Sequence, residues 1–237
     1  MERGTAVSAL ISVVSAHTRK AWRDAIRATW LPMVPEGTDV RFFLGRGDPV
    51  TQSDEVVLDC DDSYLGLPEK VQCIVRWAHE HGYDHCLKLD DDVVLSPKAM
   101  LDSGYDKFPY VGLGAHRPVP PMRPYFVAGG FAYWMDRICM EHVIAAQLPP
   151  NNYDEGWVAG VLYEHGIELH ADPRYSMAVC RTLPSVDKRR LAHRTRPDPV
   201  PGTFAWCIYF EPNGGTRFST QTKIDEFKRV FAAEAKR

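Results

Sequence analysis

The sequence predicts an α/β fold in which a mostly parallel central sheet is flanked by helices. Two observations carry this prediction. The first hundred residues alternate between short apolar runs typical of buried strands and longer segments with helical periodicity. The chain has 237 residues, 45% of them hydrophobic and 25% charged, which suits one globular domain. We therefore expect a single domain over residues 1–237.

The first strand and helix are predicted from their apolar patterns. Residues 9–15 (ALISVVS) form a continuous apolar run bounded by polar residues, as in a buried strand. A helix is expected to begin near Thr18, because Trp22, Ile26 and Trp30 recur at i, i+4 and i+8 and would share one buried face.

Two further strands, a helix and a fourth strand follow. The runs 40–44 (VRFFL) and 56–58 are strand-like, and Pro68 opens a helix that Gly82 ends. The fourth strand, 86–89 (CLKL), leads directly into three aspartates. This strand–helix alternation favours a doubly wound, largely parallel sheet.

The second half is less regular. Apolar periodicity predicts helices near 135–147, 155–165 and 224–235, and a strand over 204–210. Two proline-containing segments, 118–124 and the basic 181–203, are expected to be loops.

Cysteine usage and hydropathy bear on the compartment. The six cysteines, at positions 60, 73, 86, 139, 180 and 207, include no CxxC pair, which disfavours a zinc site. We interpret them as reduced and mostly buried; the alternative is an oxidised lumenal domain with up to three disulfides. No run approaches 18 apolar residues, and 6–14 is too short for a signal peptide, so we expect a cytoplasmic protein without a transmembrane segment.

The aspartates at 90, 91 and 92 are the main candidate site. In open α/β sheets, ligands bind just outside the carboxyl ends of strands. Neighbouring carboxylates repel by roughly 1–4 kcal/mol per close pair, and a divalent cation removes that cost. Carboxylate oxygens suit Mg²⁺, Mn²⁺ or Ca²⁺. The alternative is an acidic surface turn that caps the next segment.

Four short motifs follow one another over residues 9–94. They are R-x-x-I-R-x-T-W (Arg23, Ile26, Arg27, Thr29, Trp30), F-L-G (Phe43-Leu44-Gly45), D-x-Y-x-x-L-x-x-K (Asp62, Tyr64, Leu67, Lys70) and K-x-D-D-D-V (Lys88, Asp90, Asp91, Asp92, Val93). In order and in spacing, these motifs resemble those of the β-1,3-glycosyltransferase family of galactosyltransferases and Fringe-like enzymes. The resemblance continues more loosely through 125–130 (YFVAGG) and 154–160, where Asp154-Glu155 stands for the family's E-D pair.

The resemblance implies a GT-A fold with a Rossmann-like sheet, a nucleotide-diphosphate sugar donor, Mn²⁺ (or Mg²⁺), and inversion at the transferred carbon. Residues 1–94 would then bind donor and metal, and 95–237 would hold the acceptor and the base. Asp92 would contact the metal, with Asp91 or Asp90 touching the metal or the ribose. A late histidine completes the family's metal shell; His193 is preferred over His170.

Further residues are expected around the donor. Arg23 and Arg27 would reach the donor's base or phosphates; the alternative is a solvated helix face. Lys70 matches the family pattern at the donor site, although it may equally well serve local packing.

The acceptor hydroxyl must lose a proton as the new bond forms, so a carboxylate base is required. Asp154 is our choice and Glu155 the second, whereas a purely structural interpretation makes Asp154 the cap of a helix.

The acceptor itself is open. We expect a saccharide. The basic residues clustered in 181–196, in a protein of net charge −3, also permit hydroxymethylated DNA as acceptor. A non-catalytic nucleotide-sugar binding module is the alternative of another class. A phosphotransferase using the same aspartates is disfavoured, because the sequence has no Walker-type phosphate loop.

Overall fold

The computed structural model describes residues 8–49, 52–114, 131–151, 153–179 and 205–209, together with positions 225 and 228. The strands are β1 (Ala9–Val14), β2 (Asp39–Leu44), β3 (Glu55–Val57), β4 (His85–Asp90), β5 (Val93–Leu95), β6 (Tyr110–Gly112), β7 (Ala132–Asp136), β8 (His170–Ala171), β9 (Tyr175–Val179) and β10 (Ala205–Tyr209). The α-helices are α1 (Lys20–Arg27), α2 (Leu67–Glu80), α3 (Pro97–Leu101), α4 (Arg137–Ala145) and α5 (Asp154–Glu164). Short 3₁₀ helices are η1 (His17–Arg19), η2 (Leu31–Met33), η3 (Tyr64–Gly66) and η4 (Tyr105–Lys107).

The central sheet has seven strands in the order β3-β2-β1-β4-β7-β6-β8. Its first four strands are mutually parallel, with β1 paired to β2 on one side and to β4 on the other. Strand β7 runs antiparallel to both β4 and β6. The predicted α/β class with a mostly parallel sheet is confirmed, and the antiparallel β7 is the departure from a purely parallel one.

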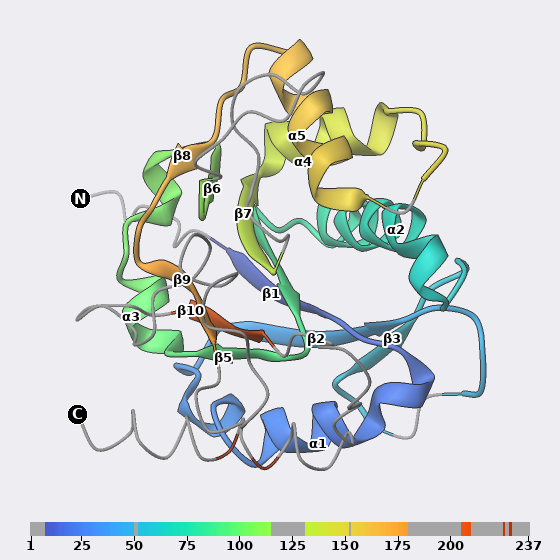
Figure 1. Ribbon diagram of the computed structural model, residues 1–237, viewed down its shortest axis with the longest axis vertical. Coiled ribbons are helices and arrows are strands. Elements are labelled where there is room, and N and C mark those ends of the chain that lie inside the picture. Colours follow the sequence, from blue (N-terminus) through green and yellow to red (C-terminus); the bar gives the residue numbers. More distant parts are fainter. Residues whose placement is uncertain are drawn as a thin grey trace.

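Helices cover both faces of this sheet, as Figure 1 shows, with α1 on one side and α2, α4 and α5 on the other. Each face buries its own apolar cluster. The α1 side contains Trp22, Ile26 and Trp30, all at most 4% exposed, so their predicted core role is confirmed. The opposite cluster packs apolar residues of α2, α4 and α5 against β1 and β4.

A second, three-stranded sheet in the order β5-β10-β9 adjoins the α1 side. Strand β5 begins two residues after β4 ends and pairs antiparallel with β10, more than 100 positions later in the chain. The turn at Asp91 and Asp92 therefore lies where the chain leaves the main sheet for the small one. The pairing of β4 in the main sheet and of β5 in the small one fixes the backbone on both sides of the two aspartates.

The predicted elements differ from the observed ones mainly at their ends. Helix α1 stops at Arg27, and Trp30 reaches the same apolar cluster from the following turn, where its indole Nε1 donates to the Val93 carbonyl at 3.2 Å. Of the predicted helix 224–235, only 225 and 228 are described, and both are helical. The predicted loops 118–124 and 181–203 lie outside the described residues.

Cys60, Cys73, Cys86 and Cys139 are free thiols, in agreement with the reduced interpretation at those four positions. Cys180 and the side chain of Cys207 lie outside the described part. Among the described residues, no helix is both long and apolar enough to cross a membrane.

Candidate active site

The aspartates lie at the topological switch point of the sheet. From β1 the chain proceeds outward to β2 and β3, and then returns to β4 on the other side of β1. The carboxyl ends of β1 and β4 therefore lie side by side where the strand order reverses, and doubly wound sheets bind ligands in the crevice just outside such strand ends. Ser15 follows β1, and Asp91 and Asp92 follow β4, so both segments meet at this crevice.

Asp91 is buried and its two carboxylate oxygens already have protein partners. The Arg19 Nε donates to both oxygens at 2.8 Å, and Arg19 Nη2 also bonds Oδ1. Ser15 Oγ donates to Oδ2 at 2.7 Å. With only 3% of its side chain exposed, Asp91 is no part of a solvated acidic turn. It joins the connection after β1 to the one after β4.

Behind Ser15, a chain of buried polar contacts continues into α1. Arg23 donates to Ser15 Oγ at 3.1 Å and to Glu55 Oε1 at 2.9 Å. Arg27 donates to the same Glu55 oxygen at 2.8 Å and to Asp54. The two arginine side chains are 5% and 15% exposed, so the alternative of a solvated helix face is wrong. In this structure the two arginines connect α1 to the edge of the sheet. That they contact the donor stays a prediction.

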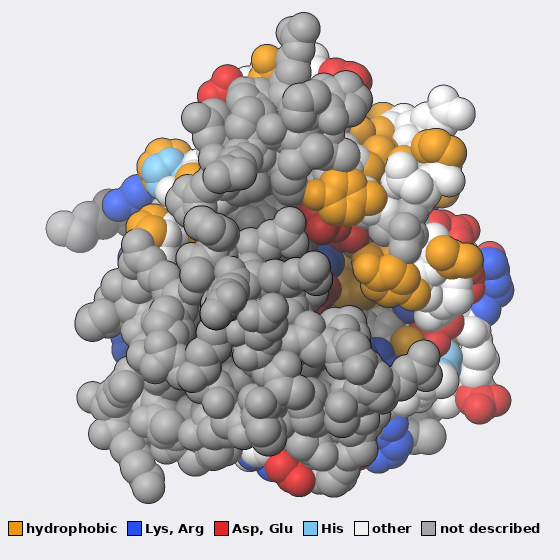
Figure 2. All heavy atoms as spheres, in the orientation of Figure 1, with side chains coloured by type: hydrophobic (Ala, Val, Ile, Leu, Met, Phe, Trp, Pro, Cys, Tyr) orange, Lys and Arg blue, Asp and Glu red, His pale blue; other side chains and the backbone are white. Residues whose placement is uncertain are grey.

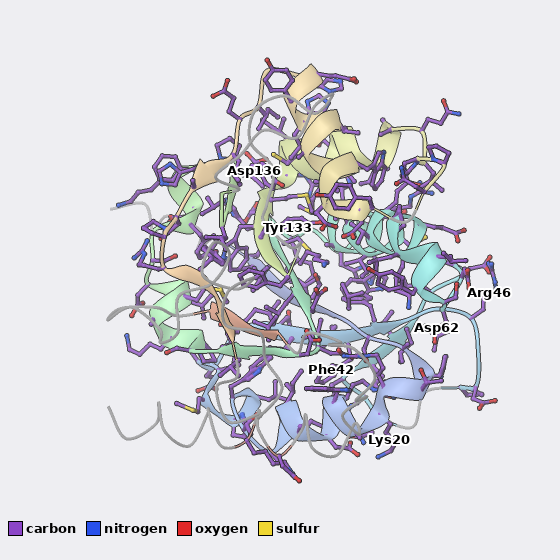
Figure 3. The ribbon with its side chains drawn as sticks, in the orientation of Figure 1. Lys20, Phe42, Arg46, Asp62, Tyr133 and Asp136 are labelled. Carbon is purple, nitrogen blue, oxygen red and sulfur yellow. The ribbon has the colours of Figure 1, made fainter. Side chains whose placement is uncertain are left out.

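Lys70, on α2, bonds the segment that follows β1. Its Nζ donates to the Ser15 carbonyl at 2.9 Å and to Asp62 Oδ1 at 2.7 Å. Asp62 also accepts from the backbone nitrogens of Gly45, at 2.6 Å, and His17. A Cβ on Gly45 would come within 2.6 Å of the Asp62 backbone, which explains the glycine in the F-L-G segment. Figure 3 shows Asp62 beside the start of α2.

Lys88 lies between the carboxylates of Asp90 and Asp154. Its side chain is 1% exposed, and its Nζ lies 2.6 Å from Asp90 Oδ1 and 3.6 Å from Asp154 Oδ2. Nζ also lies 5.7 Å from the ring centroid of Tyr133, which Figure 3 shows on β7 in the middle of the molecule. Burial opposes the ammonium charge, but Asp90 and Asp154 outweigh it and raise the Lys88 pKa. Lys88 is therefore a buried cation between the two groups.

Asp90 and Asp92 are the more accessible aspartates of the cluster. Their side chains are 32% and 36% exposed. Burial, together with neighbouring charges that include Asp92, raises the Asp90 pKa to about 7. Burial and the Asp91 charge raise the Asp92 pKa as well. Excess negative charge at this position is what a bound cation would relieve.

The two candidate bases differ in exposure. Asp154 is 2% exposed and is the first residue of α5, whereas Tyr153 occupies the N-cap, so the interpretation of Asp154 as a helix cap is wrong. Glu155 is only partly buried. Burial, followed by the charge and hydrogen bond of Asp154, raises the Glu155 pKa to about 8. The pair thus holds one carboxyl group that is poised to titrate near neutral pH.

Aromatic residues border this carboxylate pair. Tyr64, on η3, and Tyr153 both have raised pKa values, for which burial and the charges of Glu155 and Asp154 are responsible. The Tyr64 residue is nevertheless 75% exposed, as is its neighbour Leu65. Figure 2 shows acidic atoms recessed between hydrophobic side chains on this face of the molecule.

The metal ligands are only partly placed. Within the described ranges, no group of three or more His, Cys, Asp or Glu side chains is arranged to hold a metal ion. His193 lies outside those ranges. His170 is stacked on Phe108 at 3.5 Å in β8, three strands from β4, or about 14 Å across the sheet. Among the described residues, Asp92 and Asp90 would be the ligands of a divalent ion. The rest of its coordination shell would come from a bound ligand or from residues outside the described ranges.

The structure brings together most of the residues predicted for the site. Asp90, Asp91 and Asp92 lie at the end of β4, and Lys88 links Asp90 to Asp154, the neighbour of Glu155. Arg23 and Lys70 both bond Ser15 at the end of β1. Sequence reasoning missed two functional candidates, Arg19 and the bridging role of Lys88. Lys88 was visible in the K-x-D-D-D segment, but nothing in the sequence linked Arg19 to an aspartate 72 positions away.

Comparisons with known proteins support the fold. No protein-family model matches the sequence, and a search of curated proteins finds no relative. Among solved structures, an active-site mutant of LgtC aligns over 94% of this chain and 95% of its own, with 12% identity and a TM-score of 0.52. The galactosyltransferase LgtC in complex with donor and acceptor sugar analogs aligns equally far, with 12% identity and a TM-score of 0.51. A nucleotide-diphospho-sugar transferase from Desulfovibrio desulfuricans G20 covers 69% of this chain and 78% of its own, with 11% identity and a TM-score of 0.47. The mixed sheet, its helical layers and the two full-length alignments together identify the fold of this chain as the GT-A fold of nucleotide-sugar transferases.

Proposed function

We propose that this protein is an inverting glycosyltransferase that moves a sugar from a nucleotide-diphosphate donor, a UDP-sugar, to an acceptor hydroxyl. The observation that carries the proposal is the placement of Lys88. It joins Asp90, at the switch point where donors bind, to Asp154, beside the candidate base. Transfer in one displacement needs donor and acceptor groups at such a junction.

On the donor side, Asp92 and Asp90 would hold Mn²⁺ or Mg²⁺ against the diphosphate, with His193 as the predicted further ligand. The carboxylate oxygens of Asp92 and Asp90 and the raised pKa values of both residues fit a hard divalent cation. When bound, the ion would offset the negative charge that grows on the leaving diphosphate. The contacts of Asp91 with Arg19 and Ser15 support a positioning role for that residue.

On the acceptor side, the difference in exposure favours Glu155 as the base over our initial choice, Asp154. Glu155 is accessible, and a pKa of about 8 suits proton transfer near neutral pH. Its carboxylate would take the acceptor proton as the acceptor oxygen bonds to the sugar carbon and the bond to the diphosphate breaks. The charge of Asp154, which is buried beside Lys88, raises the proton affinity of Glu155 and would so make the ionised Glu155 carboxylate the stronger base.

A saccharide acceptor is supported by the exposed side chains next to this base. Sugars present apolar C–H faces that pack against aromatic rings, and Tyr64 offers an exposed ring near Glu155. The alternative acceptor, hydroxymethylated DNA, rests on the basic segment 181–196, which lies outside the described residues. The two acceptors are separated by direct assay.

The test supplies labelled UDP-sugars and Mn²⁺, with a set of saccharides in one arm and hydroxymethylated duplex DNA in the other. We expect label in a saccharide, loss of transfer with EDTA, and recovery with Mn²⁺. Glu155→Gln should lower turnover by at least roughly a hundredfold, the low end for removing a general base. The matched control, Glu164→Gln, changes an exposed glutamate of the same helix and should behave as wild type.

Other outcomes point elsewhere. Label only in DNA would replace the saccharide by the nucleic-acid acceptor and leave the chemistry of donor and base intact. UDP binding without UDP release, whatever the acceptor, would indicate a non-catalytic nucleotide-sugar binding module. Full activity of Glu155→Gln with inactive Asp154→Asn would return the base role to Asp154.

A further inference from the structure

Arg19 is a preorganised cation in the donor crevice. It is the last residue of η1 and the N-cap residue of α1, and it lies immediately after the connection from β1. Its guanidinium lies against buried Asp91 and reaches within 3.6 Å of Asp92 Oδ2, and its carbon Cζ lies 5.2 Å from the ring centroid of Trp22. The side chain nonetheless keeps 38% of its surface exposed.

The contacts engage only part of the guanidinium. Nε and Nη2 bond to Asp91, whereas Nη1 has no hydrogen-bond partner among the described residues. Arginine presents its five N–H donors in a rigid fork that matches phosphate geometry. With one edge fixed on Asp91, the other edge remains available to a ligand in the crevice.

The anchor that holds Arg19 is itself rigid. Asp91 is bonded by Ser15, Ser15 by Arg23, and Arg23 by Glu55, so a chain of three buried residues holds the carboxylate. A side chain fixed in this way loses little entropy when a ligand binds, and therefore contributes more to affinity. A metal ion on Asp91 would compete with Arg19 at either oxygen and with Ser15 at Oδ2.

We infer that Arg19 binds the diphosphate of the donor and that Asp91 is the buried anchor that aims it, not a metal ligand. This inference rests on the proposed function and adds a phosphate-binding residue to it. The three aspartates would otherwise repel the diphosphate. Arg19 offsets one of their charges, and a cation on Asp92 and Asp90 would offset the others.

The test compares UDP with uridine, which lacks the phosphates, by titration calorimetry in the presence of Mn²⁺. Arg19→Ala should weaken UDP binding about ten- to a hundredfold, the range for losing a charge-assisted hydrogen-bonded group, and leave uridine binding unchanged. The matched control, Lys20→Ala, removes the adjacent cation, which pairs with Asp24 on the surface, and should bind UDP as wild type does. Thermal unfolding of each variant verifies that it is folded.

A second measurement tests the role of Asp91. Mn²⁺ binding, followed by electron paramagnetic resonance without nucleotide, should be weakened by Asp92→Asn and kept by Asp91→Asn. Loss of Mn²⁺ binding in Asp91→Asn to the same extent as in Asp92→Asn would overturn the anchor assignment. Equal UDP affinity of wild type and folded Arg19→Ala would overturn the phosphate assignment alone. If wild type does not bind UDP at all, the proposed function fails, and the Arg19 assignment fails with it.

Discussion

Lys88→Met should destabilise the protein far more than the same change at an exposed lysine. The Lys88 side chain is 1% exposed and compensates Asp90 and Asp154, and methionine has a similar length without the charge. Removing one partner of a buried ion pair costs about 3–5 kcal/mol, because the other charge stays buried and unpaired. Asp90 is 32% exposed and can be partly rehydrated, so we expect the lower end, about 3 kcal/mol.

For a chain of this size, about 3 kcal/mol corresponds to a fall in Tm of about 6–12 °C. Differential scanning calorimetry or circular dichroism measures this shift. Lys98→Met is the control: Lys98 also pairs with an aspartate, Asp102, but its side chain is 78% exposed, and such surface pairs contribute about 0–1 kcal/mol. A second variant, Lys88→Met/Asp154→Asn, removes a buried carboxylate as well and should recover part of the loss.

The reasoning is refuted if the Tm of Lys88→Met falls no further than that of Lys98→Met. It is also refuted if adding Asp154→Asn destabilises Lys88→Met as much as Asp154→Asn destabilises the wild type. That result would mean that Lys88 and Asp154 do not share one electrostatic network.

Four further predictions concern the site and the residues that support it. The pKa of Glu155 is raised from an ordinary 4.5 to about 8 in the folded state. We therefore expect kcat/KM to rise roughly tenfold per pH unit below about 8 and then to level off. Glu155→Gln should not show this rise. The contribution of Glu155 to folding stability has the opposite dependence on pH. This contribution is fully present below about pH 4.5 and is lost as the pH rises through about 8. Denaturant titrations at several pH values measure it. Glu55→Gln should lower the free energy of unfolding by about 3–5 kcal/mol in urea titrations, because it leaves buried Arg23 without its anion. Burial opposes the charge of Glu55, but hydrogen bonds from Arg27 and Arg23 outweigh it and lower the Glu55 pKa. Acidification below the ordinary glutamate range should therefore erase the difference in stability between the variant and wild type. Tyr64→Ala should raise the acceptor KM and leave UDP affinity unchanged, and equal acceptor KM values would exclude the stacking role.

Local patterns predicted the first half of the fold well. The apolar runs at 9–15, 40–44 and 86–89 became β1, β2 and β4 within one or two residues, because a buried parallel strand leaves a continuous hydrophobic signature. Helix α2 was equally visible, since Gly82, with φ of 81°, ends it as expected of a C-terminal glycine. The β5-β10-β9 sheet as a unit was not predicted, because its β5-β10 pairing joins residues more than 100 positions apart.

For the site, the sequence by itself determined which carboxylates stand at a strand end, and through the order of strands and helices it determined that this end is a ligand-binding edge. It could not determine what each carboxylate touches. The tertiary structure alone decided that Asp91 faces Arg19, that Asp90 and Asp154 share Lys88, and that Asp154 is buried while Glu155 is accessible. The physical reason is that periodicity reports only which side of an element is buried. Hydrogen bonds and ion pairs depend on side-chain distances of about 3 Å, which only the packed elements fix.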